Sequence, residues 1–268
     1  MKERIITGVI LGLIVLGAIF CLSNTIFDIA VAVVLLFAAW EWTALANIKK
    51  ITTKIIYLAI SLVLIYLSRY SQLTVLLISL LFWFFACYLV LRYPNIPFKA
   101  ISPGARYAMG FLVIVPMWIS LSLLHQQKPA LLLLMMLVVT LADSGAYFVG
   151  RQYGKKKLAP IISPKKTVEG FVGGFVFGGL AGVICALVIS HSHFEQTILI
   201  ILSFAIVIVA LLGDLFESMI KRECGVKDSG TILPGHGGIL DRMDSLFSSF
   251  PIFVLMLIIF GLLGVDSM

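Results

Sequence analysis

The sequence predicts an all-α, polytopic integral membrane protein with about nine transmembrane helices and a cytoplasmic N-terminus. Of its 268 residues, 61% are hydrophobic and only 12% are charged, whereas soluble globular domains are about one-quarter charged. The apolar residues form continuous runs, not the alternating segments of a transmembrane β-barrel. Because a helix needs about 20 apolar residues to cross the hydrocarbon core, we expect spans over nine ranges: 5–22, 26–46, 55–68, 73–91, 108–124, 130–149, 169–190, 196–220 and 246–264.

The basic residues predict the orientation of these spans. If the N-terminus is cytoplasmic and the spans alternate, 18 of the 20 Lys and Arg residues fall in cytoplasmic segments, and only Arg69 and Lys128 fall outside. This asymmetry is typical of the positive-inside rule. We therefore expect a multi-pass protein of a bacterial-type inner (plasma) membrane with its active site on the cytoplasmic face. Nucleic-acid binding is not expected, because the basic residues are spread over membrane loops and do not gather on one folded module.

The two parts of the chain differ in their polar content. Residues 1–130 are apolar spans joined by short loops, and we expect them to form a helical scaffold. Glu41 lies there between Trp40 and Trp42, a pattern typical of an interfacial anchor. Residues 131–268 carry almost all other polar groups, so we expect the active site in this part. Glycines recur every fourth residue from Gly170 to Gly182, which favours close helix packing over a ligand contact.

Three acids lie within or at the ends of the predicted spans: Asp143, Asp214 and Glu217. An ionised carboxylate in a membrane costs at least a few kcal/mol, so three of them on one side indicate a shared cation or substrate. Asp214, Glu217, Ser218 and Lys221 follow one another at i, i+3, i+4 and i+7 and therefore line one helical face.

A second pair of acids, Asp241 and Asp244, stands just before the last predicted span. Carboxylate oxygens suit a hard cation such as Mg²⁺, which usually takes one or two carboxylates together with substrate phosphates. Coupled to Asp214 across the glycine-rich loop, this pair predicts a metal centre. His236 has no second His or Cys at ligand spacing, so it is expected to hydrogen-bond a phosphate or other substrate group.

Basic residues surround these acids. Ser163-Pro164 indicates an N-cap and a proline at the first helical position, which would place Lys165 and Lys166 in the first helical turn. A bound anion would offset the unfavourable helix dipole there. Further phosphate contacts are expected from Lys221, Arg222, Lys227 and Arg242. Acids, a hard cation and many bases at a membrane surface indicate a polyphosphate substrate and phosphoryl or nucleotidyl transfer, although no Walker A sequence is present. The alternatives are another membrane transferase acting on a lipid phosphate, such as a polyprenyl-phosphate enzyme, and a transporter of phosphorylated solutes.

The segment from Ser218 to Asp244 resembles the signature of the phosphatidate cytidylyltransferases (CDP-diacylglycerol synthases). That signature has Ser, Lys-Arg, Lys-Asp, His-Gly-Gly and Asp-Arg-x-Asp, and the matching residues are Ser218, Lys221, Arg222, Lys227, Asp228, His236, Gly237, Gly238, Asp241, Arg242 and Asp244. The segments that begin at Asp143 and Ser163 also resemble parts of this family. The likeness covers residues 139–248.

This resemblance implies that CTP and phosphatidic acid in the membrane give CDP-diacylglycerol and pyrophosphate, with Mg²⁺ required. It implies metal ligation by Asp214 and Asp241, and it leaves a homodimer open. The residues expected to carry the chemistry are Asp214, Asp241, Lys221, Arg222 and Asp244. The expected substrate-binding residues are Asp143, Lys165, Lys166, Ser218, Lys227, His236, Gly237, Gly238 and Arg242. Asp143 would contact a second cation or the nucleotide.

Overall fold

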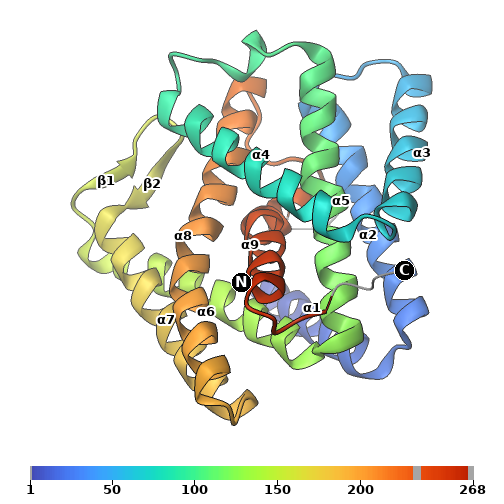
Figure 1. Ribbon diagram of the computed structural model, residues 1–268. Coiled ribbons are helices and arrows are strands. Elements are labelled where there is room, and N and C mark those ends of the chain that lie inside the picture. The colour runs from blue at the N-terminus through green and yellow to red at the C-terminus, as the bar shows by residue number, and fades with distance from the viewer. Residues whose placement is uncertain (1, 232–236, 265–268) are drawn as a thin grey trace.

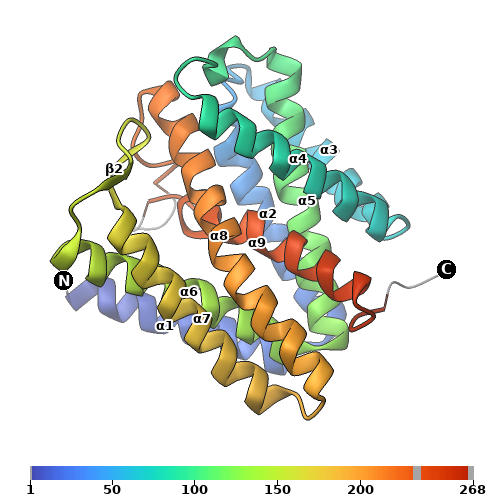
Figure 2. The ribbon, with the colours of Figure 1, turned by 60° about the vertical axis from the view of Figure 1, so that its left-hand side comes forward.

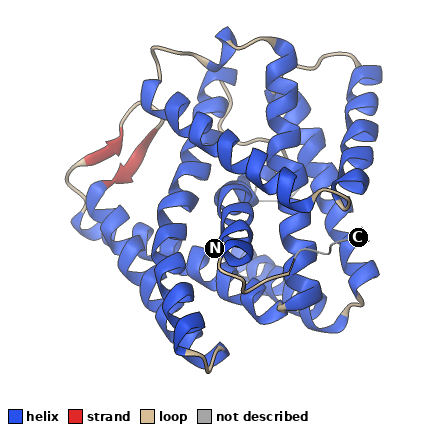
Figure 3. Cartoon of the chain, in the orientation of Figure 1, coloured by secondary structure: helices blue, strands red, loops and turns tan. Residues whose placement is uncertain are grey.

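The computed structural model describes residues 2–231 and 237–264, and within these ranges the chain is a bundle of long helices with one short β-hairpin (Figures 1 and 3). The helices are α1 (Lys2–Cys21), α2 (Asn24–Leu45), α3 (Ile51–Ser68), α4 (Gln72–Arg92), α5 (Pro103–Gln127), α6 (Pro129–Tyr153), α7 (Val168–Ile189), α8 (His193–Cys224) and α9 (Leu240–Ile259). A 3₁₀ turn, η1 (Phe98–Ala100), precedes α5, and the hairpin strands are β1 (Lys157–Ala159) and β2 (Ser163–Thr167).

Eight of the described helices, α2 to α9, are long and apolar enough to cross a membrane, and α1 adds a shorter apolar stretch, Gly12–Cys21. The predicted polytopic all-α fold is therefore confirmed. The helix ends follow local sequence rules. Ser102 caps α5 by accepting a hydrogen bond from the Ala105 N–H at 3.3 Å, with Pro103 next in line. Gly225 ends α8 in the left-handed conformation, with φ of 71°.

α9 lies in the middle of the bundle and packs against α4, α5 and α8 (Figure 1). α6, α7 and α8 form a neighbouring layer, and the α6–α7 contact is the tightest in the molecule (Figure 2). The predicted glycine stripe explains it. A Cβ atom on Gly174 would lie 2.7 Å from the Ala142 carbonyl oxygen, and one on Gly170 would lie 2.8 Å from the Ala146 carbonyl oxygen. The backbones of α6 and α7 can approach this closely only because glycine has no side chain.

The prediction of a helix N-cap at Ser163 is wrong. Residues 163–167 form strand β2, which pairs antiparallel with β1 in the register Lys157 to Thr167 and Ala159 to Ser163. The cap of α7 is Thr167, whose hydroxyl accepts a hydrogen bond from the Gly170 N–H at 3.1 Å. Pairing with β1 outweighs the local cap signal at Ser163, so Lys165 lies in the hairpin and not in the first turn of α7.

The two basic residues outside the predicted cytoplasmic segments each have an acidic partner. Arg69 lies 3.7 Å from Asp28, and Lys128 lies 2.5 Å from Glu195. Both pairs lie at the end of the bundle formed by the α3–α4, α5–α6 and α7–α8 connections. The orientation predicted from the other basic residues stays a prediction.

Candidate active site

A cavity of about 490 Å³ lies between α6, α7 and α8, beside the β-hairpin. We call it the α6–α8 cavity. Its charged walls are Asp143, Arg151, Lys165, Lys166 and Asp214, and its other walls are Ala142, Ala146, Tyr147, Gly150, Leu158, Thr167, Gly170, Phe171, Gly174, Val207, Ala210 and Leu211. The basic groups come from the hairpin and the end of α6. Val207 and Ala210 continue the wall along α8 into the membrane span. The cavity therefore joins a cationic part to an apolar part.

Asp214, one of the two acids that line this cavity, has an ion-pair partner and a hydrogen-bond donor. Its Oδ2 atom forms an ion pair with Lys166 Nζ, and its Oδ1 atom accepts a hydrogen bond from Ser218 Oγ at 3.1 Å. The side chain is 23% exposed, so it remains accessible from the cavity. Asp143 lines the same cavity from α6 and is exposed. The structure thus brings together Asp143, Lys165, Lys166, Asp214 and Ser218, all of which the sequence predicts as site residues.

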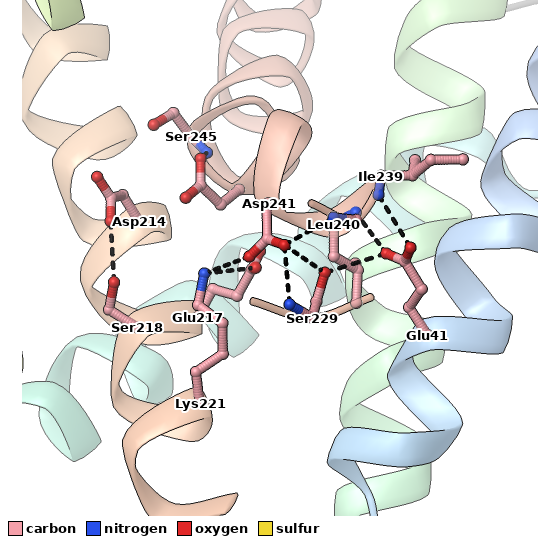
Figure 4. A network of polar contacts seen from close by, with 12 residues as sticks. Glu41, Asp214, Glu217, Ser218, Lys221, Ser229, Ile239, Leu240, Asp241 and Ser245 are labelled. Carbon is pink, nitrogen blue, oxygen red and sulfur yellow. Dashed lines mark hydrogen bonds and ion pairs between the residues drawn. The ribbon is translucent and has the colours of Figure 1, made fainter. Parts of the chain in front are cut away.

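A second cluster links α8 to α9 (Figure 4). Lys221 Nζ lies 3.1 Å from Glu217 Oε1 and 2.6 Å from Asp241 Oδ1, and all three side chains are at most 10% exposed. Glu217 precedes Lys221 by one helical turn, as the spacing predicts. Two carboxyl groups therefore share one buried ammonium, and the ion pairs tie α8 to α9.

Asp241 also binds the glycine-rich loop. Its Oδ2 atom accepts hydrogen bonds from Ser229 N at 2.8 Å, Ser229 Oγ at 3.0 Å and Gly238 N at 2.9 Å. Gly237 has a φ of 86°, and a Cβ atom there would lie 2.9 Å from Asp241 Oδ2. Gly237 therefore has a physical reason to be glycine: its backbone approaches the Asp241 carboxylate closely, in a conformation that other residues rarely adopt. For Gly238 the reason is space, because a Cβ atom there would collide with Ser229 Oγ and would lie 2.5 Å from Glu41 Oε2.

Glu41 is the main residue of the site that the sequence analysis missed. It is 3% exposed, so its interpretation as an interfacial anchor is wrong. Glu41 Oε1 accepts from Ile239 N at 3.0 Å, and Oε2 accepts from Leu240 N at 2.9 Å and Ser229 Oγ at 3.1 Å. It therefore caps the N-terminus of α9 from a different helix, as Figure 4 shows. The signal in the sequence is an acid in an otherwise apolar span, which is costly unless it has polar partners.

The other predicted residues lie around these two clusters. Asp244 is half-buried in the second turn of α9. It lies against α8, where the Asp244 carbonyl oxygen comes so close to Gly213 that a Cβ atom on Gly213 would collide with it. Arg222 donates from Nε to the Ile162 carbonyl oxygen at 3.1 Å, which ties α8 to the hairpin. Lys227 and Arg242 are exposed, and neither is among the residues that line the α6–α8 cavity. His236 lies outside the described residues.

The donor set can be compared with the predicted metal centre. Among the described residues, no group of three or more His, Cys, Asp or Glu side chains converges at metal-binding distance. Magnesium ordinarily uses one or two carboxylates and completes its shell with water and substrate phosphates. Asp214 and Asp241 fit that role, since each presents a hard oxygen ligand that is paired with a lysine ammonium. A metal ion at either carboxylate would take the place of its ammonium partner.

Known proteins resemble the chain over nearly its whole length. The model of the cytidylyltransferase family matches residues 2–260. A phosphatidate cytidylyltransferase from Pseudomonas aeruginosa is 39% identical, with 96% of this chain and 97% of the relative covered. Relatives of the same name from Haemophilus influenzae and Bacillus subtilis are 36% and 34% identical. They cover 94% and 97% of this chain and 97% and 99% of their own length, respectively.

Proposed function

The chain belongs to the cytidylyltransferase family and is a nucleotidyltransferase, and from this premise we propose that it joins CTP to phosphatidic acid, giving CDP-diacylglycerol and pyrophosphate. The observation that carries the proposal is the α6–α8 cavity. Its cationic part, formed by Arg151, Lys165 and Lys166, suits phosphate groups, and its apolar part along α8 suits the glycerol and acyl chains of a lipid. A water-soluble phosphate ester would need only the first of these parts.

In the proposed reaction, a phosphate oxygen of phosphatidic acid attacks the α-phosphorus of CTP. A new P–O–P bond forms, the bond between the α-phosphorus and the β-phosphate oxygen breaks, and pyrophosphate leaves with that electron pair. The second pKa of a phosphate monoester is about 6, so the nucleophile is already largely ionised at pH 7. The protein therefore has no need of a strong general base. Its contribution is to hold two anionic reactants together and to neutralise the charge of the leaving group.

The residue roles follow from position. Lys165 and Lys166 are proposed to bind phosphates inside the cavity. Asp143 on the cavity wall and Ser218, which donates to Asp214, are proposed as hydrogen-bonding groups. Lys221 is buried between two carboxylates, so its proposed role is to offset their negative charge. A further set, Arg222, Lys227, His236, Arg242 and Asp244, is proposed to complete the phosphate and nucleotide contacts.

Magnesium is proposed as the cofactor, held by Asp214 and Asp241. When bound, it would neutralise phosphate charge and make pyrophosphate a better leaving group. The chain's own residues support this in a specific way. Lys166 is paired with Asp214 in the structure. Once a magnesium ion binds the Asp214 carboxylate, the Lys166 ammonium can form an ion pair with a substrate phosphate instead. The same applies to Lys221 and Asp241.

The site is proposed to face the cytoplasm, where CTP is found, in a bacterial-type inner membrane. The support is the excess of basic residues on the loops at the end of the bundle that carries the hairpin. A homodimer stays a prediction.

The test uses the purified protein in detergent with phosphatidic acid, Mg²⁺ and each nucleoside triphosphate in turn. We expect lipid-linked nucleotide and pyrophosphate with CTP, and none with ATP, GTP or UTP. EDTA should abolish the product and added Mg²⁺ should restore it. If a folded protein gives no lipid-linked nucleotide with any triphosphate, the proposal is refuted, and transfer to another lipid phosphate becomes the alternative. Polyprenyl phosphate as acceptor in the same assay measures that alternative directly.

A further inference from the structure

A second cavity, of about 350 Å³, lies at the opposite end of the bundle from the α6–α8 cavity. We call it the Asp28 cavity. It opens where α2 begins, where α3 passes into α4, and where α5 ends, on helices that stand side by side in Figure 1. Its lining is mostly polar: Asn24, Thr25, Asp28, Arg69, Gln72, Trp118, Ile119, Ser122, Leu123 and Gln126. Such a lining is unusual in a chain of this hydrophobicity.

Two hydrogen-bond acceptors of this cavity have no donor among the residues that the structure describes. Asp28 is 6% exposed. Its Oδ2 atom has only long contacts, to Gln126 Nε2 at 3.4 Å and to Arg69 at 3.7 Å. Its Oδ1 atom and the Oε1 atom of Gln72 are both buried and have no hydrogen-bond partner within the described chain. A buried acceptor without a donor costs about 1–3 kcal/mol, and more when it is charged. Rotation about the last side-chain bond exchanges the two Asp28 oxygens, because that torsion is soft.

A cationic group stands at the rim of the same cavity. The Arg69 side chain is 45% exposed, and its guanidinium lies over the Trp118 ring at 5.1 Å. Guanidinium has five N–H donors in a fixed plane, so Arg69 can bind an anion while it remains near Asp28. The cavity therefore has acceptors inside and a cation at its mouth. That arrangement fits a zwitterion whose N–H-bearing cation points inward and whose anion stays at the rim.

The position of the cavity indicates where such a zwitterion would come from. Most of the residues that form it lie within about two turns of a helix end, which is near the level of lipid headgroups. Tyr66 and Tyr70 stand beside Arg69 and are 56% and 61% exposed. Exposed tyrosines at that position are typical of the membrane–water interface.

We propose that the Asp28 cavity binds the headgroup of a phospholipid that carries a primary ammonium and a phosphate, in the leaflet opposite the nucleotidyltransferase site. The ammonium donates to Asp28 and Gln72, and the phosphate pairs with Arg69. A quaternary ammonium of the same charge has no N–H to donate, so it leaves both acceptors unpaired. A single monovalent cation fills only a small part of about 350 Å³ and leaves Arg69 without an anion.

The test measures the thermal unfolding midpoint of the full-length protein in detergent against added lipid. Phosphatidylethanolamine and phosphatidylcholine with identical acyl chains are compared, because they differ only in the methylation of the nitrogen. We expect a saturable rise with phosphatidylethanolamine and a half-saturating concentration at least about tenfold higher for phosphatidylcholine, since a buried charged hydrogen bond corresponds to about that factor. Asp28→Asn should abolish the difference between the two lipids, because only their nitrogens differ. Arg69→Gln removes the partner of the phosphate that both lipids carry, so it should raise the half-saturating concentration of both. The matched control is Glu195→Gln, which removes an acid at the same end of the bundle but outside the cavity.

Three outcomes would overturn the proposal. One is an equal response of the unaltered protein to the two lipids, which needs no variant to fold. Another is a full response to soluble phosphoethanolamine at the same concentration, which would assign the site to a free ligand. The third is a rise with sodium or potassium chloride alone that disappears in Asp28→Asn, which would make it an alkali-cation site. None of these results depends on the nucleotidyltransferase reaction.

Discussion

Replacing Glu41 by Gln should impair the enzyme although Glu41 lies on a helix far from the signature segment in sequence. The carboxylate accepts three hydrogen bonds, from Ile239 N, Leu240 N and Ser229 Oγ, at 3.0, 2.9 and 3.1 Å. Glutamine has nearly the same shape but only one acceptor oxygen. Its amide group would face at least one backbone N–H, donor against donor.

The expected size of the effect follows from these contacts. A hydrogen bond to a charged group contributes about 1.5–3 kcal/mol, and an unsatisfied buried donor costs about 1–3 kcal/mol. These two costs overlap, because the N–H left unpaired at the start of α9 is the donor of the lost bond, so the total is roughly 2–4 kcal/mol. If that energy appears as loss of the ordered first turn, kcat/KM falls by about 30-fold to about 1000-fold, at 1.36 kcal/mol per factor of ten. Asp241 lies in that turn and is displaced with it.

The assay is CTP-dependent turnover of phosphatidic acid by Glu41→Gln, Glu41→Asp and Glu195→Gln, each shown to elute as a folded protein. Glu41→Asp keeps both acceptor oxygens on a shorter arm and should retain more activity than Glu41→Gln. Glu195→Gln removes an acid at the other end of the bundle and should behave as the unaltered protein. Unchanged kcat/KM in a folded Glu41→Gln protein would refute the reasoning. Equal losses in Glu41→Gln and Glu195→Gln would attribute the effect to general destabilisation.

Three further predictions concern the proposed magnesium ion and the α6–α8 cavity. Asp241→Asn, in protein shown to be folded, should lose Mg²⁺-dependent turnover by at least about 100-fold, measured as product formed with and without EDTA; retained activity would place the metal elsewhere. Lys166→Gln should raise the KM for CTP or phosphatidic acid. It should change the unfolding midpoint little, because an ion pair that is partly exposed contributes little to stability. Gly174→Ala should lower the unfolding midpoint by several degrees, since its Cβ would lie 2.7 Å from the Ala142 carbonyl oxygen. Gly104→Ala, where a Cβ meets nothing within 4 Å, is the matched control.

The spans could be predicted because they depend on local properties. Each apolar run is long enough to identify a helix by itself, whereas the direction predicted from the basic residues stays a prediction. The ion-pairing face of α8 was predictable for the same reason, since Glu217 and Lys221 are one turn apart. Helix boundaries were less accurate: α9 begins at Leu240, so Asp241 lies inside the helix and not before it. Apolarity marks where a helix is buried in lipid, and a polar first turn lacks that signal.

The role of Glu41 could not be predicted, because its donors follow it by 188 to 199 residues. No periodicity connects positions that far apart. The strand at Ser163–Thr167 escaped prediction for a related reason: the pairing partner Lys157–Ala159 is part of a lysine-rich loop with no strand pattern. The contact of Glu41 with α9 also crosses the predicted division between residues 1–130 and residues 131–268. The first part of the chain thus supplies a group on which the geometry of the second part depends.

A comparison of Glu41 with Asp28 supports a ligand in the Asp28 cavity. Both acids belong to α2, at opposite ends of the helix, and both are more than nine-tenths buried. Both oxygens of Glu41 have backbone or hydroxyl donors within 3.1 Å, which is how a folded protein normally compensates a buried carboxylate. Asp28 has one oxygen without a donor and another with contacts of 3.4 and 3.7 Å. Since the same helix satisfies one acid fully from within the chain, the incomplete shell of the other indicates that its missing donors come from outside the chain.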